Sequence, residues 1–295
     1  MHKHDEEYGG AYGRAFAIGA GLNIAFVIVE AVFGWISGSL ALLADAGHNL
    51  GDVLALLLAW GAVILARRSP SDRRTYGLRR ATILAALISA LLMLFAVIGI
   101  GIESVRRLAS PAPVAGTTVI IVAAVGVVIN TITVMLFHRD RRHDLNIRSA
   151  WLHMAADAAV SAGVVIAGVA MVMTGWLWLD PAISLAIAAV ILVATWQLLT
   201  ESVDMSVDAV PRQVDPVAVR QYLTSIEGVA AVHDLHIWPT STSETALTAH
   251  LVMPGGGDDE LLQDIASTLD QRYHVHHPTI QIEHRELPDC LGCDP

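Results

Sequence analysis

Two pairs of ionisable residues with the same spacing lie in apolar stretches of the sequence. His48 precedes Asp52 by four positions, and His153 precedes Asp157 by four positions. Four residues make about one helical turn, so each pair falls on one face of a helix. Two imidazoles and two carboxylates form a donor set that suits a tetrahedral transition metal, and zinc is the leading candidate.

A hydrogen-bonded structural pair is the alternative interpretation for either His/Asp pair taken alone. The repetition favours a metal site, because buried charge is hard to tolerate without a compensating ion. Two aspartates neutralise one divalent cation in a medium of low dielectric constant. Without the cation, at least one of the two carboxylates should take up a proton, so metal binding is coupled to proton release.

The elements that must position these residues are apolar helices. Hydrophobic residues make up 54% of the chain, charged residues only 16%, and the mean hydropathy is +0.56, which excludes a soluble enzyme. Glu30 lies within the first apolar segment and should face the helix bundle rather than lipid. Six segments have about the length that a membrane span requires, at about 14–36, 40–66, 81–103, 116–138, 149–173 and 177–200.

Formal charge divides the chain into a nearly neutral part and an acidic part. From Val203 onward, 15 Asp and Glu and 4 Arg give a net charge of −11. The net charge of the whole chain is −10, so the residues before Val203 have a net charge of +1. We therefore expect a polar tail over 1–13, a membrane domain over 14–202 and a separate domain over 203–295. No cleavable signal is visible, and the two cysteines, both near the C-terminus, imply no disulfide framework.

The distribution of arginine along the sequence predicts the orientation of the chain in the membrane. The segment 67–80 holds six arginines and 138–148 holds four, whereas 37–39 and 175–180 hold none. The connection after the third span has only Arg106 and Arg107. The positive-inside rule then places both termini and the acidic domain in the cytoplasm.

The acidic domain shows a mixed α/β pattern. A helix is expected over 215–226, and alternating apolar residues predict strands over 229–238 and 245–253. A second helix follows Asp258, and a last strand covers 278–284. The expected order is helix–strand–strand–helix–strand.

The sequence resembles the cation diffusion facilitator family, in particular its zinc transporters of the ZnT/CzcD/ZitB-like branch. The matching stretches are SLALLADAGHNLGDVLAL, DLNIRSAWLHMAADAAVS, HPTIQIEH and DCLGCDP. The resemblance implies an α-helical membrane protein with six transmembrane helices and a C-terminal cytoplasmic ferredoxin-like α/β domain. It further implies a homodimer in a lipid bilayer, with a bacterial inner membrane as the expected location and no nucleic-acid partner.

Further metal ligands are implied by the same resemblance. Four tail residues fall where zinc-transporter relatives place ligands, namely His233, His250, His276 and Glu283. Cys290 and Cys293 match a terminal thiolate pair, and His2 and His4 resemble an N-terminal motif that completes such a site on the partner subunit. Zinc would then be both the transported substrate and a structural or regulatory ion.

The connection between the second and third spans departs from the family pattern. Many relatives have Tyr-Gly-x-His-Arg-x-Glu there, whereas this chain has Arg79 and Thr82 in place of the histidine and the glutamate. We therefore expect no metal site in this connection.

The expected function is export of Zn²⁺, with Cd²⁺ or Co²⁺ as further substrates, in exchange for protons by alternating access. The direction of transport is implied by the resemblance alone. Two alternatives use the same four residues: a membrane metalloenzyme and a metal sensor that signals through its tail. Catalytic zinc usually has three protein ligands and an open position, and the chain lacks a His-Glu-x-x-His motif, so no enzyme is expected.

Overall fold

The structure is a computed structural model that describes residues 21, 24–137 and 145–285, without the side chains of 56, 133, 136–137 and 145–154. Contacts divide the chain into two compact units, one of residues 1–56 and 89–196 and the other of 57–88 and 197–295. Each unit is described by itself.

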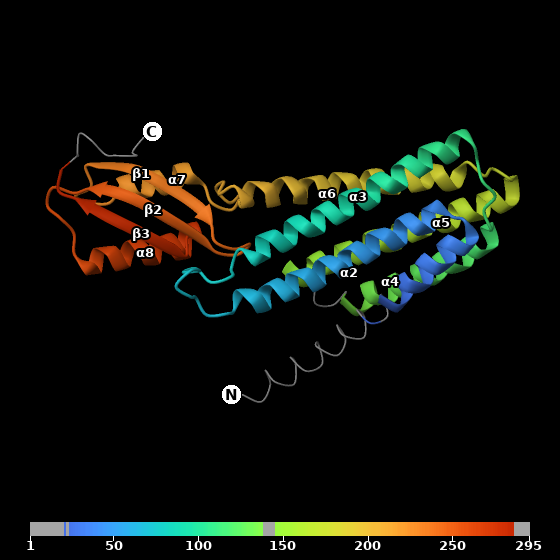
Figure 1. The fold of residues 1–295 in the computed structure, drawn as a ribbon, viewed down its shortest axis with the longest axis horizontal. Coiled ribbons are helices and arrows are strands. Elements are labelled where there is room, and N and C mark those ends of the chain that lie inside the picture. Colours follow the sequence, from blue (N-terminus) through green and yellow to red (C-terminus); the bar gives the residue numbers. More distant parts are fainter. Residues whose placement is uncertain (1–20, 22–23, 138–144, 286–295) are drawn as a thin grey trace, which may run out of the picture. The chain divides into compact units, whose positions relative to one another are not determined.

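Apolar helices make up most of the described residues before residue 207 (Figure 1). A helix over Ile24–Ser37 precedes five longer ones, which are α2 (Leu40–Ala66), α3 (Ala81–Ala109), α4 (Gly116–Phe137), α5 (Leu145–Thr174) and α6 (Leu179–Ser206). Within the described residues, α2, α3, α6 and the segment Ala155–Thr174 are long and apolar enough to cross a membrane, and two shorter helices are also apolar. Large apolar side chains such as Phe95 and Val193 are 70% and 73% exposed, as lipid-facing positions require.

Helix α3 is longer than the apolar segment from which it was predicted. The apolar segment of α3 ends near residue 103, but the helix runs to Ala109. Glu103 forms ion pairs with Arg106 and Arg107 at the i+3 and i+4 positions, which stabilise this last turn. These two arginines therefore lie in a helix, and their placement in a connecting loop was wrong because polar pairs also prolong helices.

The start of α2 is held by a buried carboxylate from α6. Asp180 accepts hydrogen bonds from the hydroxyl of Ser39 and from the backbone N–H of Leu40. The side chains of Asp180 and Ser39 are fully buried. Because the first N–H groups of a helix have no partner within it, Asp180 acts as a cap supplied from another helix.

Helices α4 and α5 pack closely because two glycines lie at their contact. A Cβ atom on Gly116 would lie 2.8 Å from Val172, and one on Gly168 would lie 2.8 Å from Ile120. Small residues allow the backbones of membrane helices to approach. This packing positions α5, which carries Asp157.

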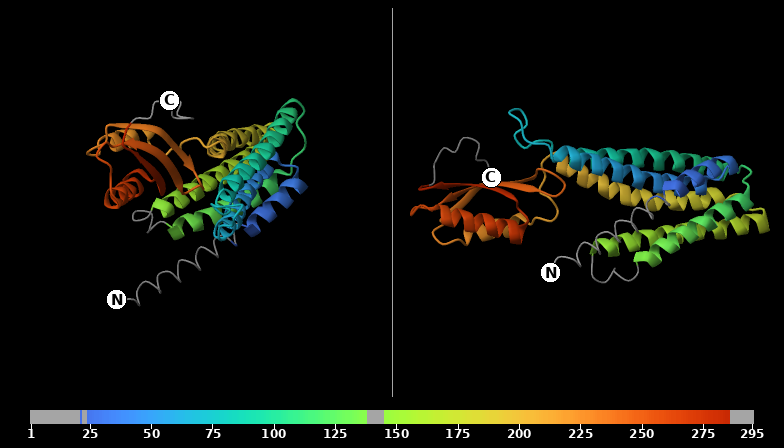
Figure 2. Two further views of the ribbon diagram at one scale, coloured as in Figure 1. Left: turned by 60° about the vertical axis from the view of Figure 1, so that its left-hand side comes forward. Right: turned by 90° about the horizontal axis from the view of Figure 1, so that it is seen from below.

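The second unit contains the predicted αββαβ domain, whose sheet is seen with helices against one side in Figures 1 and 2. Its elements are α7 (Pro216–Thr224), β1 (Ala231–Pro239), β2 (Thr245–Val252), α8 (Asp259–Tyr273) and β3 (His277–Glu283). The strand order is β1-β2-β3, with β1 antiparallel and β3 parallel to β2. The fold class expected from the sequence is thus confirmed.

Local sequence explains the ends of the two tail helices. Asp215 caps α7 by accepting from the N–H groups of Val217 and Ala218, and Asp258 caps α8 in the same manner. His274 ends α8 in a left-handed conformation with φ of 57°. The helices cover a core of buried apolar residues: Val219, Leu223, Leu247, Leu251, Ile265 and Leu269.

Candidate metal centres in the membrane and tail domains

The membrane site brings together residues from two helices that are distant in the sequence. His48 and Asp52 lie one turn apart on α2, and Asp157 lies on α5. The Nε2 atom of His48 is 3.7 Å from Oδ2 of Asp52 and 3.7 Å from Oδ1 of Asp157. Ligand atoms around one tetrahedral zinc ion lie roughly 3.4 Å apart, so these three groups are close to the spacing that such an ion needs.

Burial differs among the three described members of this site. The side chain of Asp157 is 5% exposed, whereas those of His48 and Asp52 are 23% and 39% exposed. A carboxylate this buried needs a compensating polar or charged partner, and the imidazole of His48 lies 3.7 Å from Asp157. His153 lies one turn before Asp157 on α5, and its side chain is outside the described part of the structure.

Polar and steric contacts hold the two helices around the site. The hydroxyl of Ser161 on α5 donates a hydrogen bond of 3.0 Å to Asp45 on α2. Gly51, beside Asp52, faces Met93 of α3 so closely that an added Cβ would lie 2.1 Å from its sulfur. A larger residue at 51 would therefore require the flexible side chain of Met93 to move away from α2.

The tail site lies on one face of the sheet and uses one residue from each strand. His233 of β1 pairs directly with His250 of β2, and Glu283 of β3 lies two positions beyond the partner of His250. Carboxylate oxygens of Glu283 lie 3.0 Å from His233 Nε2 and 3.0 Å from His250 Nδ1. One ligand atom from each residue falls within 4.8 Å of the others, which fits a single metal ion.

Asp234 is a polar neighbour of this site that sequence reasoning missed. It has φ of 51°, at the irregularity where the β1–β2 register shifts between His233 and His236. Its carboxylate oxygens lie 2.9 Å from His236 Nε2 and 3.5 Å from His250 Nε2. The sequence His-Asp-x-His was the one signal for it, but strict strand alternation would have separated Asp234 from His250.

The electrostatic setting of Glu283 favours cation binding. Burial acts to raise the pKa of this carboxyl, but hydrogen bonding with His233 and donation from the Gln281 amide outweigh it, so the pKa lies below its ordinary value of 4.5. Glu283 is therefore an ionised acceptor between two imidazoles at neutral pH.

His276 is not part of this cluster. Its ring Nδ1 accepts a hydrogen bond from the backbone N–H of Thr245, at the first residue of β2. His250 lies five residues further along that strand, roughly 16 Å away. The structure thus separates His276 from the other three predicted tail ligands within one chain.

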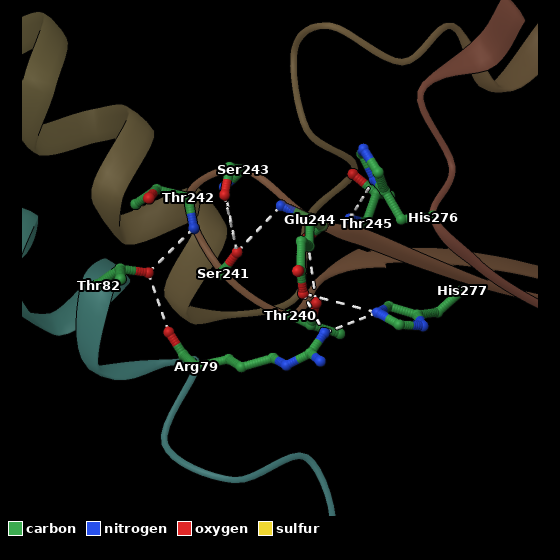
Figure 3. Close-up of polar contacts among 10 residues, drawn as sticks. All are labelled: Arg79, Thr82, Thr240, Ser241, Thr242, Ser243, Glu244, Thr245, His276 and His277. Atoms are coloured by element: carbon green, nitrogen blue, oxygen red, sulfur yellow. Dashed lines mark hydrogen bonds and ion pairs between the residues drawn. The ribbon is translucent and has the colours of Figure 1, made fainter. Parts of the chain in front are cut away.

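Arg79, which stands where many relatives have a histidine, forms an ion pair. Figure 3 shows Arg79 directed at Glu244 and His277, and it forms an ion pair with Glu244. Thr82 accepts a hydrogen bond from the backbone N–H of Thr242 in the β1–β2 turn. The residues just before α3 and the first turn of α3 are therefore bonded to the tail domain by polar contacts within the second unit.

Four predicted ligands lie outside the described residues, namely His2, His4, Cys290 and Cys293.

The chain combines apolar helices that carry a cluster of carboxylates and an imidazole with a sheet domain that carries a second such cluster. These features are typical of membrane proteins that bind metal cations. The family model named cation efflux transmembrane domain matches residues 17–205 of the sequence. The family model named cation efflux protein, cytoplasmic domain matches residues 211–285. The chain belongs to the cation efflux family.

Curated relatives match along nearly the whole chain. The zinc transporter ZitB of Yersinia pestis is 38% identical over 94% of this chain and 88% of its own length. The metal cation efflux system protein CzcD of Cupriavidus metallidurans is 34% identical, over 99% and 92%. A cadmium, cobalt and zinc/H⁺-K⁺ antiporter of Bacillus velezensis is 31% identical, over 96% and 91%.

One solved structure is also similar to part of the chain. The metal-bound C-terminal domain of the CzcD transporter is 32% identical, and the match covers 24% of this chain and 99% of that domain, with a TM-score of 0.22.

Proposed function

We propose that this protein exports Zn²⁺ from the cytoplasm in exchange for protons, and that His48, Asp52, His153 and Asp157 bind the ion during transport. The observation that carries this proposal is the position of His48 Nε2, 3.7 Å from one carboxylate on its own helix and 3.7 Å from another on α5. The names of two relatives, the zinc transporter ZitB and the cadmium, cobalt and zinc/H⁺-K⁺ antiporter, support the choice of cation.

The donor set explains how metal and protons exchange. Zinc binds neutral imidazole nitrogens and ionised carboxylates, so protons compete with it at every ligand. The two aspartates cancel the charge of the ion, which lowers the cost of holding it in an apolar bundle. Because the ligands are divided between α2 and α5, a relative movement of these helices can open the site to one side at a time.

The tail domain provides a separate site with a structural or regulatory role. His233, His250 and Glu283 would hold one zinc ion, and Cys290 and Cys293 would ligate metal as a thiolate pair. His2 and His4 would join this thiolate site from the partner subunit. His276 could contribute only to another ion.

The protein acts as a homodimer in a bacterial inner membrane, with both termini in the cytoplasm. Each tail from Val203 onward holds 15 acidic residues and 4 arginines, so two tails repel at a dimer axis. Bound zinc cancels part of this charge and draws the tails together. The family match to a cytoplasmic domain of efflux proteins supports this placement.

Zinc flux into proteoliposomes tests the assignment of the membrane site. Asp157→Ala should reduce the initial rate by at least about a hundredfold, since it leaves the ion without a buried charge partner. Glu103→Gln is the matched control, because this carboxylate lies at the end of α3 and pairs with arginines. A folded Asp157→Ala protein with wild-type flux would contradict the site.

A further inference from the structure

Two more carboxyl groups lie beside the membrane site, and the proposed zinc ligands do not include them. Glu30 comes from the helix Ile24–Ser37 and Asp45 comes from α2, and both are 0% exposed. The two carboxyl groups are close enough to form a hydrogen bond with each other when one carries a proton. They are therefore a buried acidic pair inside the helix bundle.

Each carboxyl has one oxygen with a donor and one without. The Asn49 amide lies 3.5 Å from Glu30 Oε2 as a donor, and the Ser161 hydroxyl donates at 3.0 Å to Asp45 Oδ2. Among the described residues, Glu30 Oε1 and Asp45 Oδ1 have no hydrogen-bond donor although both atoms are buried. A proton on one carboxyl would turn an oxygen into a donor for the other, which removes both the repulsion and the unsatisfied acceptors.

A hydrogen bond of this pair joins the two helices that carry the proposed zinc ligands. Asp45 precedes His48 by three residues on α2, and Ser161 follows Asp157 by four residues on α5. The Asp45–Ser161 hydrogen bond therefore joins the same two helices as the His48–Asp157 contact. A change in the spacing of α2 and α5 would act on both.

We propose that Glu30 and Asp45 share one proton, and that this pair is a proton-binding site that empties when zinc occupies the neighbouring site. The inference rests on the proposed zinc site. The other ionisable groups that act on the pair are Asp157 on α5, which acts on both carboxyl groups, and His48 on α2, which acts on Asp45. Zinc brings two positive charges and displaces at least one proton from its own ligands, so the neighbouring site gains at most one net positive charge. In a medium of low dielectric constant, this gain favours departure of the shared proton to water. The pair then changes from a net charge of −1 to −2.

The test counts the protons released when zinc binds to the full-length protein in detergent. Zinc is added in weakly buffered solution with a pH indicator, and all proteins carry His233→Ala and His250→Ala so that this tail site is silent. Glu30→Gln keeps the side-chain length, and its amide can donate to Asp45, so it imitates the protonated pair without a proton to lose. Glu103→Gln is the control.

We expect Glu30→Gln to bind zinc and to release about one proton fewer per ion. Asp45→Asn should show the same loss, and the double variant should lose no more, because the pair holds a single proton. A wild-type count in any folded member of this set, or a further loss in the double variant, would overturn the proposal.

Two further measurements distinguish a shared proton from an incorrect zinc site and from a bound monovalent cation. Asp157→Ala should abolish zinc binding at the membrane site; if it does not, the zinc site is wrong, whatever the proton count of Glu30→Gln. Replacing potassium by choline in the solution should leave the count unchanged. If the count changes for the parent protein but not for Glu30→Gln, a monovalent cation occupies the pair and the proton assignment fails.

Discussion

The membrane and tail sites use similar donors but are built in different ways. The membrane residues come from two separate helices, α2 and α5, which side-chain contacts such as Asp45–Ser161 link. The tail residues come from three adjacent strands whose register is set by backbone hydrogen bonds. A site on separate helices can be taken apart during transport, whereas a site on a sheet stays assembled.

The substitution His250→Ala is expected to produce the largest difference between the two sites. His250→Ala removes the central ligand of the proposed tail site, and the zinc affinity of the tail should fall by about a hundredfold or more. Zinc flux at saturating metal should stay within about twofold, because the proposed membrane ligands are unchanged. Calorimetry and proteoliposome flux measure the two quantities. Equal losses in both would show that the sites act as one.

A smaller effect is expected from Asp234, which touches two histidines of the tail. Asp234→Asn should weaken zinc binding by about tenfold, since outer partners orient ligating imidazoles. Asp258→Asn is a suitable control, because an asparagine still caps α8. An unchanged affinity would indicate that the strand register alone orients His250.

Selectivity tests the membrane site. His48→Asp makes its donor set richer in oxygen, which should favour cadmium or harder ions relative to zinc. A difference of about 1 kcal/mol in metal preference corresponds to roughly fivefold in the transport ratio. Competition flux with both metals measures this ratio. An unchanged ratio would assign selectivity to the shape of the pathway.

The smallest effect concerns pH and the zinc-free tail. The pKa of Glu283 is lower in the folded domain than its ordinary value of 4.5, so its ionised form stabilises the fold. This contribution is complete above about pH 4.5 and is lost as the pH falls through the lowered value. Thermal melts of residues 203–295 at acidic pH should show it, and Glu283→Gln should flatten the curve. A parallel pH dependence in both proteins would contradict this role.

Much of the fold could be predicted because its signals are local. Apolar runs predicted the spans, and alternation with Asp and Gly boundaries predicted β1, β2, β3, α7 and α8 close to their observed bounds. The C-terminal end of α3 was missed, because ion pairs at helical spacing continue a helix beyond its apolar part.

The sequence by itself determined which residues could bind metal and, through helical spacing, that His48 and Asp52 share a face. Only the tertiary structure decided which distant residues meet. Strand register brings His233, His250 and Glu283 together and leaves His276 at the other end of β2. The bundle likewise brings Glu30 to Asp45. Such contacts depend on packing between elements, and spacing along one element carries no information about them.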